Sequence, residues 1–266
     1  MEDIFKEIAI IKSEGGSAAL ATAIKTTGST PREAGSKMLI RSDGTIVGSI
    51  GGGSLEATIC QEAVNVIKED KPKVLHFNLT EEEVAGDGML CGGTMDIFIE
   101  PILSEPTLYI FGGGHISLPL AAISKMVGYR VVVVDDRPEF ANQDRFPEAD
   151  EIIAQDFSLA FSRLKVNRSS YITIVTRGHL YDETVLEWAV NTDAAYVGMI
   201  GSKKKNDTIF SNLRSKGVSK KLLESVHAPI GLEIHAETPE EIAVSIMAEI
   251  IKVRRKSEHT VKNWKI

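Results

Sequence analysis

The sequence predicts an α/β protein with two domains, a mixed α+β domain followed by a doubly wound parallel-sheet domain. The character of the chain changes near residue 104, where ILSEPT contains the Pro and Ser of a short connector. Before it, short strand-like runs alternate with turn signals. After it, nearly continuous apolar runs recur with helix-length segments between them, as in βαβ units. We therefore expect domains over residues 1–103 and 107–258, and a C-terminal tail over 259–266.

The first domain combines two helical patterns with five short strands. Apolar residues at three- and four-residue steps predict a helix that starts near Ile4 and ends near Gly15. The same spacing in SLEATICQEAVNVIKED predicts a second helix. The strand-like runs cover residues 17–25, 37–41, 45–50, 74–79 and 94–102. Turn sequences such as GSTPREAGS and SDG separate them, which is typical of a sheet with short connections.

The second domain contains five apolar runs that predict a parallel sheet: LYIF, RVVVV, EIIA, YITIV and AYVGMI. Strands without polar alternation are expected where helices cover both faces of a sheet. The last helix is well marked, because Thr238 and Glu241 form a capping box and Pro239 occupies the first helical position. In the usual strand order the first and fourth strands are neighbours, and a ligand crevice lies at their carboxyl ends.

Composition indicates a globular protein of the cytoplasm. The net charge is −7 without a long Lys/Arg block, which argues against a nucleic-acid partner. Two cysteines cannot form a disulfide framework or supply the four ligands of an iron–sulfur cluster. The start MEDIFKEIAI carries acids instead of the basic region of a signal peptide, and no apolar stretch is as long as a membrane span. We expect no membrane contact.

The first strand of the second domain leads into a glycine-rich loop, LYIFGGGHIS. Gly112 and Gly114 match the first two positions of a dinucleotide-binding fingerprint, and Ser117 stands at the third. Such a loop brings a phosphate close to amides at a helix N-terminus. The next strand ends in Asp135-Asp136, at the distance expected of a ribose-binding carboxylate, a role that we assign to Asp135. These features predict a Rossmann-like fold, whose loop either binds a nucleotide such as NAD(P) or is a tight turn that binds nothing.

Other polar residues follow the same strand ends. His115 follows the first strand, whereas Arg177 and His179 follow the fourth, so we expect them on opposite walls of one crevice. After the fifth strand, GMIGSKKKND contains Gly201 and Lys203, which can close this crevice over an anion. Each histidine alone is better explained by a structural role. Their convergence on one edge makes ligand binding an equal alternative.

The first domain contains a second glycine loop, GSIGGGSLEA, between a strand and a helix. Gly51, Gly52 and Gly53 can direct several backbone N–H groups at one anion, and Glu56 lies in the first turn of the helix. The alternative is a tight turn with ordinary packing. The segment GSTPRE adds Arg32, whose guanidinium suits an oxyanion.

The two cysteines have different surroundings. Cys91 lies in GMLCGGTMDI, where neighbouring glycines leave its sulfur little to pack against. It is a filler thiol, a nucleophile or a ligand, and a nucleophile would need a lowered pKa from a helix terminus or a cation such as Arg32. Cys60 lies on the apolar stripe of a helix and is expected to be buried filler.

These motifs together resemble the XdhC/CoxI family of xanthine dehydrogenase accessory proteins. In the first domain the resemblance lies in GSTPREAGSKMLI, GTIVGSIGGGSLEA and CGGTMDIFIEP. In the second it lies in LYIFGGGHIS, VVVVDDRPEFANQDRFPEA, TRGHLYDETVL, YVGMIGSKKK and HAPIGLEIHAETPEEIAVSIMAEII. It covers nearly the whole chain.

The resemblance implies a maturation factor for molybdenum hydroxylases. Such a protein would bind molybdenum cofactor, an anionic pterin with a phosphate and in some bacteria a nucleotide. It would hold the cofactor while a cysteine desulfurase adds the sulfido ligand, and then deliver it to an apo-enzyme of the xanthine dehydrogenase type. The resemblance further implies a homodimer and a molybdenum-facing thiolate at Cys91, a soft ligand.

Two other functions stay open. The glycine loop at Gly112 and Gly114, with Asp135, equally suits an NAD(P)- or nucleotide-dependent oxidoreductase, and the second domain could also serve only as a docking module. Xanthine oxidation by this chain itself is not expected, because two cysteines and 266 residues leave no room for iron–sulfur and large cofactor domains.

Overall fold

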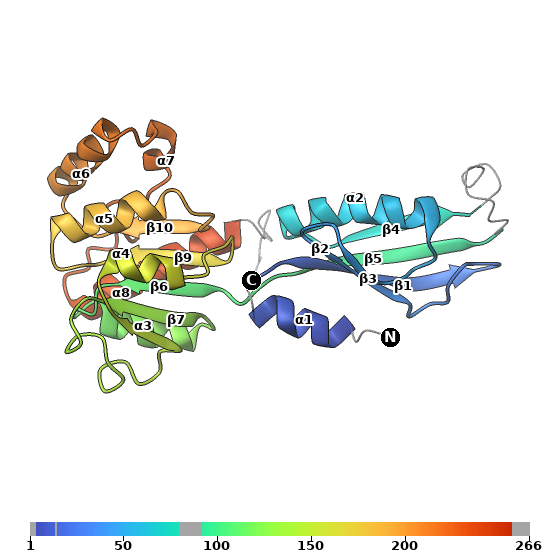
Figure 1. Ribbon diagram of the computed structural model, residues 1–266, viewed down its shortest axis with the longest axis horizontal. Coiled ribbons are helices and arrows are strands. Elements are labelled where there is room, and N and C mark those ends of the chain that lie inside the picture. The colour runs from blue at the N-terminus through green and yellow to red at the C-terminus, as the bar shows by residue number, and fades with distance from the viewer. Residues whose placement is uncertain (1–3, 14, 80–91, 257–266) are drawn as a thin grey trace, which may run out of the picture. The chain divides into compact units, whose positions relative to one another are not determined.

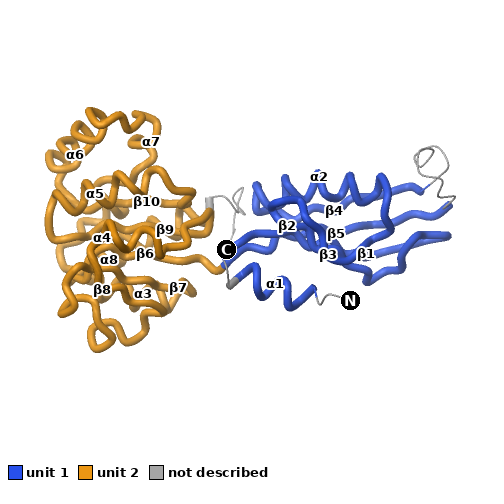
Figure 2. The backbone as a smooth tube through the Cα atoms, viewed as in Figure 1, with its two compact units in different colours: residues 1–104 blue, residues 105–266 orange. Residues whose placement is uncertain are grey.

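The structure, a computed structural model, describes residues 4–13, 15–79 and 92–256. The chain forms two compact units, residues 1–104 and 105–266 (Figure 2). The expected site residue Cys91 and the expected tail over 259–266 lie outside the described residues.

Unit 1 is an antiparallel sheet with the strand order β3-β2-β1-β5-β4 and two helices (Figure 1). Because side chains alternate along a strand, Ala19 and Ala21 pack in the core with α2, whereas Ala18 and Leu20 pack with α1. The elements are α1 (Ile4–Ser13), β1 (Ala18–Thr27), β2 (Lys37–Arg41), β3 (Ile46–Gly48), α2 (Gly53–Glu69), β4 (Lys73–Asn78) and β5 (Thr94–Ile102).

Unit 2 is a parallel sheet with the strand order β10-β9-β6-β7-β8. Its strands are β6 (Thr107–Phe111), β7 (Arg130–Asp135), β8 (Glu151–Ala154), β9 (Ser170–Ile174) and β10 (Tyr196–Met199). Its helices are α3 (Ser117–Met126), α4 (Phe157–Ala160), the 3-10 helix η1 (Phe161–Arg163), α5 (His179–Ala189), α6 (Lys203–Ser215), α7 (Lys220–Glu224) and α8 (Pro239–Lys256). The predicted doubly wound sheet is confirmed, and β6 lies beside β9 as expected.

Both faces of the unit 2 sheet are covered by helices. Val132 and Val134 belong to the core cluster that contains residues of α4, α5 and α6, whereas Val131 and Val133 belong to the cluster with α3 and α8. This arrangement explains the lack of polar alternation in the strands. The capping box of α8 is confirmed, because the Thr238 amide donates to Glu241 at 3.0 Å and the Glu241 amide donates to the Thr238 hydroxyl at 3.2 Å. None of the helices in the described ranges is long and apolar enough to cross a membrane.

Candidate functional site

The glycine loop of unit 1 is organised around the carboxylate of Glu56. Its Oε1 accepts hydrogen bonds from the amides of Ile50, Gly51 and Gly52, at 2.9, 3.1 and 2.9 Å. The Ser49 hydroxyl donates to the same oxygen at 2.8 Å. Positive φ angles at Gly51 and Gly52 allow consecutive amides to point inward. The amides that we expected to bind a ligand anion therefore bind the protein's own carboxylate, and a ligand anion would have to displace Glu56.

This arrangement favours the ionised form of Glu56. Burial opposes ionisation, but the hydrogen bonds from Ser49 and the loop amides outweigh it and lower the pKa of Glu56. The side chain is half-buried. The loop is thus held at neutral pH by charge-assisted hydrogen bonds to the Glu56 carboxylate.

Three loops that we singled out in the sequence meet in unit 1. A Cβ atom at Gly51 would lie 2.5 Å from the Pro31 ring, so the loop before α2 packs against the β1–β2 loop. A Cβ atom at Gly93 would collide with the carbonyl oxygens of Ser29 and Thr27, the latter at 2.5 Å. The segment just after Cys91 therefore packs against the same β1–β2 loop. These glycines are needed because the backbones approach closely.

The structure describes some, but not all, of the side chains that we expected to act in this loop cluster. Arg32 lies exposed on the β1–β2 loop, where its carbonyl oxygen accepts a hydrogen bond from the Thr30 hydroxyl at 3.0 Å. Cys91 lies outside the described residues, so its proximity to Arg32 stays a prediction. Cys60 is half-buried against the core of unit 1. Burial, together with the nearby Glu56 carboxylate, raises the pKa of Cys60 and keeps it a thiol.

The glycine loop of unit 2 uses its glycines in different ways. A Cβ atom at Gly112 would lie 2.5 Å from the Val175 carbonyl oxygen, and one at Gly113 would collide with the Phe140 carbonyl oxygen. The hydroxyl of buried Ser117 donates to the Gly112 carbonyl oxygen at 2.5 Å. By contrast, no atom of the described residues lies within 4 Å of a Cβ position at Gly114. The first two glycines permit tight packing, and Gly114 leaves space for a ligand.

Asp135 is buried, with 1% of its surface exposed, and its carboxylate is fully engaged inside unit 2. The Gly113 amide donates to it at 2.7 Å. Arg137 donates from its amide, Nε and Nη2, at 3.0, 2.8 and 2.9 Å. Burial raises the pKa of Asp135, but the hydrogen bonds from Arg137 and Gly113 outweigh burial and lower the pKa. Asp135 links the glycine loop to β7. Both of its carboxylate oxygens are used in doing so, and neither is left to accept a hydrogen bond from a ribose, which was the expected role.

The structure places His115, Arg177 and His179 at the carboxyl ends of the neighbouring strands β6 and β9. All three side chains are exposed. Arg177 is held by a 2.7 Å bond from its Nη2 to Oδ2 of Asp136 and a 2.8 Å bond to the Tyr181 hydroxyl. Adjacency of the strands supports the expected crevice walls, and the ligand role of each side chain stays a prediction.

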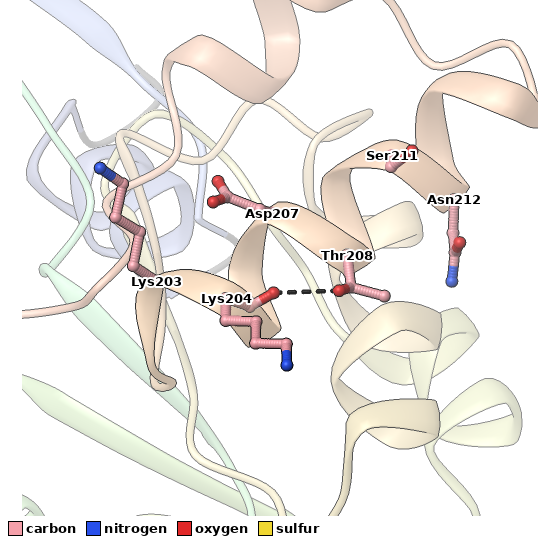
Figure 3. Close-up of a pocket in the computed structure, with 6 residues that line it drawn as sticks. All are labelled: Lys203, Lys204, Asp207, Thr208, Ser211 and Asn212. Atoms are coloured by element: carbon pink, nitrogen blue, oxygen red, sulfur yellow. Dashed lines mark hydrogen bonds between the residues drawn. The ribbon is translucent and has the colours of Figure 1, made fainter.

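The start of α6 is anchored to α5 by a buried ion pair. Lys205 pairs with Asp182, which is fully buried and also accepts a 2.6 Å hydrogen bond from the Thr176 hydroxyl. An open depression of about 670 Å³ lies along α6. In Figure 3 the ammonium groups of Lys203 and Lys204 point in different directions, so they do not form one anion clamp. The depression is lined by Lys203, Lys204, Asp207, Thr208, Ser211 and Asn212.

The sequence patterns assigned no role to two polar residues at this edge of unit 2, Asp182 and Lys205, and they placed Asp136 beside Asp135 without distinguishing the two acids. The outward-facing, half-buried position of Asp136 could have been predicted, because successive side chains point to opposite sides near a strand end. If one acid of the pair at 135 and 136 faces inward, the other must face outward. The pairing of Asp182 with Lys205 depends on how α5 and α6 pack, which spacing does not reveal.

Comparison with known families decides the assignment. A family model described as the XdhC Rossmann domain matches residues 108–250, more than half of the chain. A second model, described as the XdhC and CoxI family, matches residues 11–78. The chain belongs to the XdhC/CoxI family.

Three curated relatives of this XdhC/CoxI-family chain come from two bacteria. Uncharacterized protein YqeB of Escherichia coli is 33% identical over 95% of this chain and 46% of its own length. A Bacillus subtilis protein, named as a probable xanthine dehydrogenase subunit, is 31% identical over 61% of this chain and 47% of its own length. The molybdenum cofactor insertion chaperone PaoD of E. coli is 21% identical over 92% of this chain and 86% of its own length. The chain thus spans about half the length of the first two relatives.

The glycines of the glycine-rich stretches in this XdhC/CoxI-family protein differ in their surroundings. Apart from chain neighbours, no atom of the part that the structure describes lies within 4 Å of a Cβ position at the exposed Gly92 in unit 1 or at Gly114 in unit 2. Gly51, Gly93, Gly112 and Gly113, by contrast, are in close contact with backbone or ring atoms. The expected ligand role of Gly114 stays a prediction.

Replacing Glu56 with glutamine in this XdhC/CoxI-family protein should lower the free energy of unfolding of unit 1 by about 1–2 kcal/mol. The reason is that the loop amides would exchange charge-assisted hydrogen bonds for neutral ones. The ionised Glu56 has a lowered pKa, so its contribution is present above the ordinary value of 4.5 and is lost as the pH falls through the lowered value. Urea unfolding followed by circular dichroism over a pH series measures both effects.

Glu62→Gln is the matched control, because Glu62 lies on the same helix and pairs with Lys73 at the surface. It should lower the free energy of unfolding by much less than Glu56→Gln does, because the pair is screened by solvent. Equal losses in the two variants, or a loss at Glu56 that does not shrink in acid, would contradict the internal role of Glu56.

Proposed function

We propose that this protein binds molybdenum cofactor in the cytoplasm and takes part in its insertion into a molybdenum hydroxylase of the xanthine dehydrogenase type. The observation that carries the proposal is the similarity to PaoD, a molybdenum cofactor insertion chaperone, over 92% of this chain and 86% of PaoD. Membership of the XdhC/CoxI family supports it along both units. The partner enzyme is inferred from the B. subtilis relative, whose name refers to xanthine dehydrogenase.

Within unit 1, the loop cluster supplies the chemistry that such a cargo needs. Gly92 is exposed, and apart from chain neighbours no described residue lies within 4 Å of its Cβ position, which would let a pterin approach the backbone beside Cys91. Arg32, exposed on the adjoining β1–β2 loop, offers a guanidinium to the phosphate of the cargo. Because the pKa of Cys60 is raised, we assign the molybdenum-facing thiolate to Cys91. The loop amides that bind Glu56 do not donate hydrogen bonds to the anion of the cargo. The loop forms one wall of the proposed binding site.

Unit 2 is proposed to bind the nucleotide part of the ligand, if the ligand has one. The open space at Gly114 favours this assignment, with His115, Arg177 and His179 along the same strand edge. An NAD(P)-dependent oxidoreductase would use the same edge and is the alternative function. We further propose that the protein acts as a homodimer and holds the cofactor while a cysteine desulfurase adds the sulfido ligand.

The proposal is tested with protein purified from a bacterium that makes molybdenum cofactor. Bound pterin is measured as its oxidised fluorescent derivative, and transfer is measured as recovery of activity in a cofactor-free molybdenum hydroxylase. Adding cysteine desulfurase should increase that recovery. Folded protein that carries no pterin and restores no activity would refute the proposal.

A further inference from the structure

The two acids at the end of β7 differ in how much of their bonding capacity is used. Asp135 accepts from one amide of the glycine loop and from three donors of Arg137. Among the described residues, Asp136 accepts a single hydrogen bond, from Arg177 to its Oδ2. No hydrogen bond from this part of the chain reaches its Oδ1, which lies 3.9 Å from Nε of Arg137. Asp136 therefore offers one oxygen to a ligand.

Arg177 orients this carboxylate without burying it. The Arg177 guanidinium lies 4.7 Å from the Tyr181 ring centre and donates to its hydroxyl, which fixes the side chain against α5. The side chain of Asp136 keeps 20% of its surface exposed and that of Arg177 keeps 37%. Such a solvent-screened pair is stabilised only weakly and can adjust to a ligand.

The pair of Arg177 and Asp136 lies at the strand edge where a nucleotide would bind. Since β6 lies between β9 and β7 in the sheet, the bond from Arg177 to Asp136 spans the end of β6, the strand that leads into the glycine loop. Gly114, the glycine beside open space, is in that loop. In parallel sheets, a carboxylate at the end of the second strand binds ribose hydroxyls when a phosphate lies on this loop.

We infer that Asp136 is a ribose-binding carboxylate and that unit 2 selects ribonucleotides with a free 2′-hydroxyl. The inference rests on the proposed function only in taking unit 2 as the ligand-binding unit for a nucleotide. A 2′-phosphate would meet the negative charge of Asp136. The neighbouring Arg137 cannot compensate, because Asp135 holds its guanidinium, which also stacks on Phe140 at 3.6 Å.

Isothermal titration calorimetry of the full chain with NAD⁺ and NADP⁺ tests the selection, since the two probes differ only by the 2′-phosphate. NAD⁺ should bind at least about tenfold more tightly than NADP⁺. In Asp136→Ser the preference should reverse, because the repelling charge is gone and Arg177 is released. CDP and GDP test the nucleotides that a nucleotide form of the molybdenum cofactor could contain. Their 2′-deoxy forms should bind to the wild-type protein about tenfold more weakly than CDP and GDP themselves.

Glu224→Gln is the matched control, because it removes one carboxylate of an exposed ion pair on α7. It should leave every affinity unchanged, and thermal unfolding confirms that each variant is folded. If no probe binds, or if Asp136→Ser weakens NAD⁺ and NADP⁺ equally, the inference is overturned. Pterin content of the same preparations separates the two proposals. Pterin without nucleotide binding refutes only the Asp136 site, and nucleotide binding without pterin refutes only the proposed function.

Discussion

Replacing Cys91 with alanine is expected to remove most of the molybdenum cofactor that co-purifies with the protein. The decrease should be at least about tenfold, because even residues that only support a metal ligand change metal affinity by about 10–100-fold. The physical reason is the loss of a soft thiolate at a point where the neighbouring Gly92 leaves open space for a bulky ligand. The measurement is the fluorescence of the oxidised pterin per mole of protein.

Cys60→Ala is the control for this experiment, because Cys60 is the other cysteine and lies on α2 in the same unit. Burial and the Glu56 carboxylate raise the pKa of Cys60, so a thiolate is disfavoured there. The control should retain its pterin and lose only packing energy, about 1 kcal/mol. Undiminished loading in Cys91→Ala, or equal loss in both variants, would remove Cys91 from the binding role.

Replacing Gly93 with alanine should destabilise unit 1 by about 3 kcal/mol, which is the upper part of the range for overpacked sites. The new methyl group would collide with the carbonyl oxygens of Ser29 and Thr27. Both are backbone atoms, at the end of β1 and the start of the β1–β2 loop, so they cannot move aside as a flexible side chain would. Urea unfolding followed by circular dichroism measures the loss.

The adjacent glycine separates folding from ligand binding. Gly92 is exposed, and a Cβ atom there meets no atom within 4 Å among the residues that the structure describes. Gly92→Ala should therefore keep the stability of the wild-type protein, within about 0.5 kcal/mol. Its pterin content should nevertheless decrease, because the methyl group takes up space beside Cys91. An equal loss in the free energy of unfolding of Gly92→Ala and Gly93→Ala would contradict the open space at Gly92.

Sequence patterns predicted the fold of unit 2 well, because the period and length of the apolar runs depend directly on how a parallel sheet is covered. The β6–β9 adjacency followed from the usual strand order. The sequence patterns did not predict the roles of the acidic residues. Glu56 has the same position in the sequence whether it faces a ligand or folds back onto the amides of Ile50 and Gly51. Spacing identifies where a carboxylate is, but its side-chain direction is set by packing.

The same limit explains the choice between Asp135 and Asp136. Their distance from the glycine loop is equally suitable, and only burial distinguishes them. Alternation along β7 would have predicted that one of them points inward. It could not have predicted that Arg137 would saturate the inward one.

The carboxylate of Glu56 also determines which free ions can affect unit 1. Because Glu56 is attached to the chain beside its own loop, its effective concentration at the amides of Ile50, Gly51 and Gly52 exceeds that of any dissolved anion. Chloride or inorganic phosphate therefore competes poorly for these donors. We therefore expect the loop to keep the conformation that Glu56 imposes at any ordinary concentration of salt.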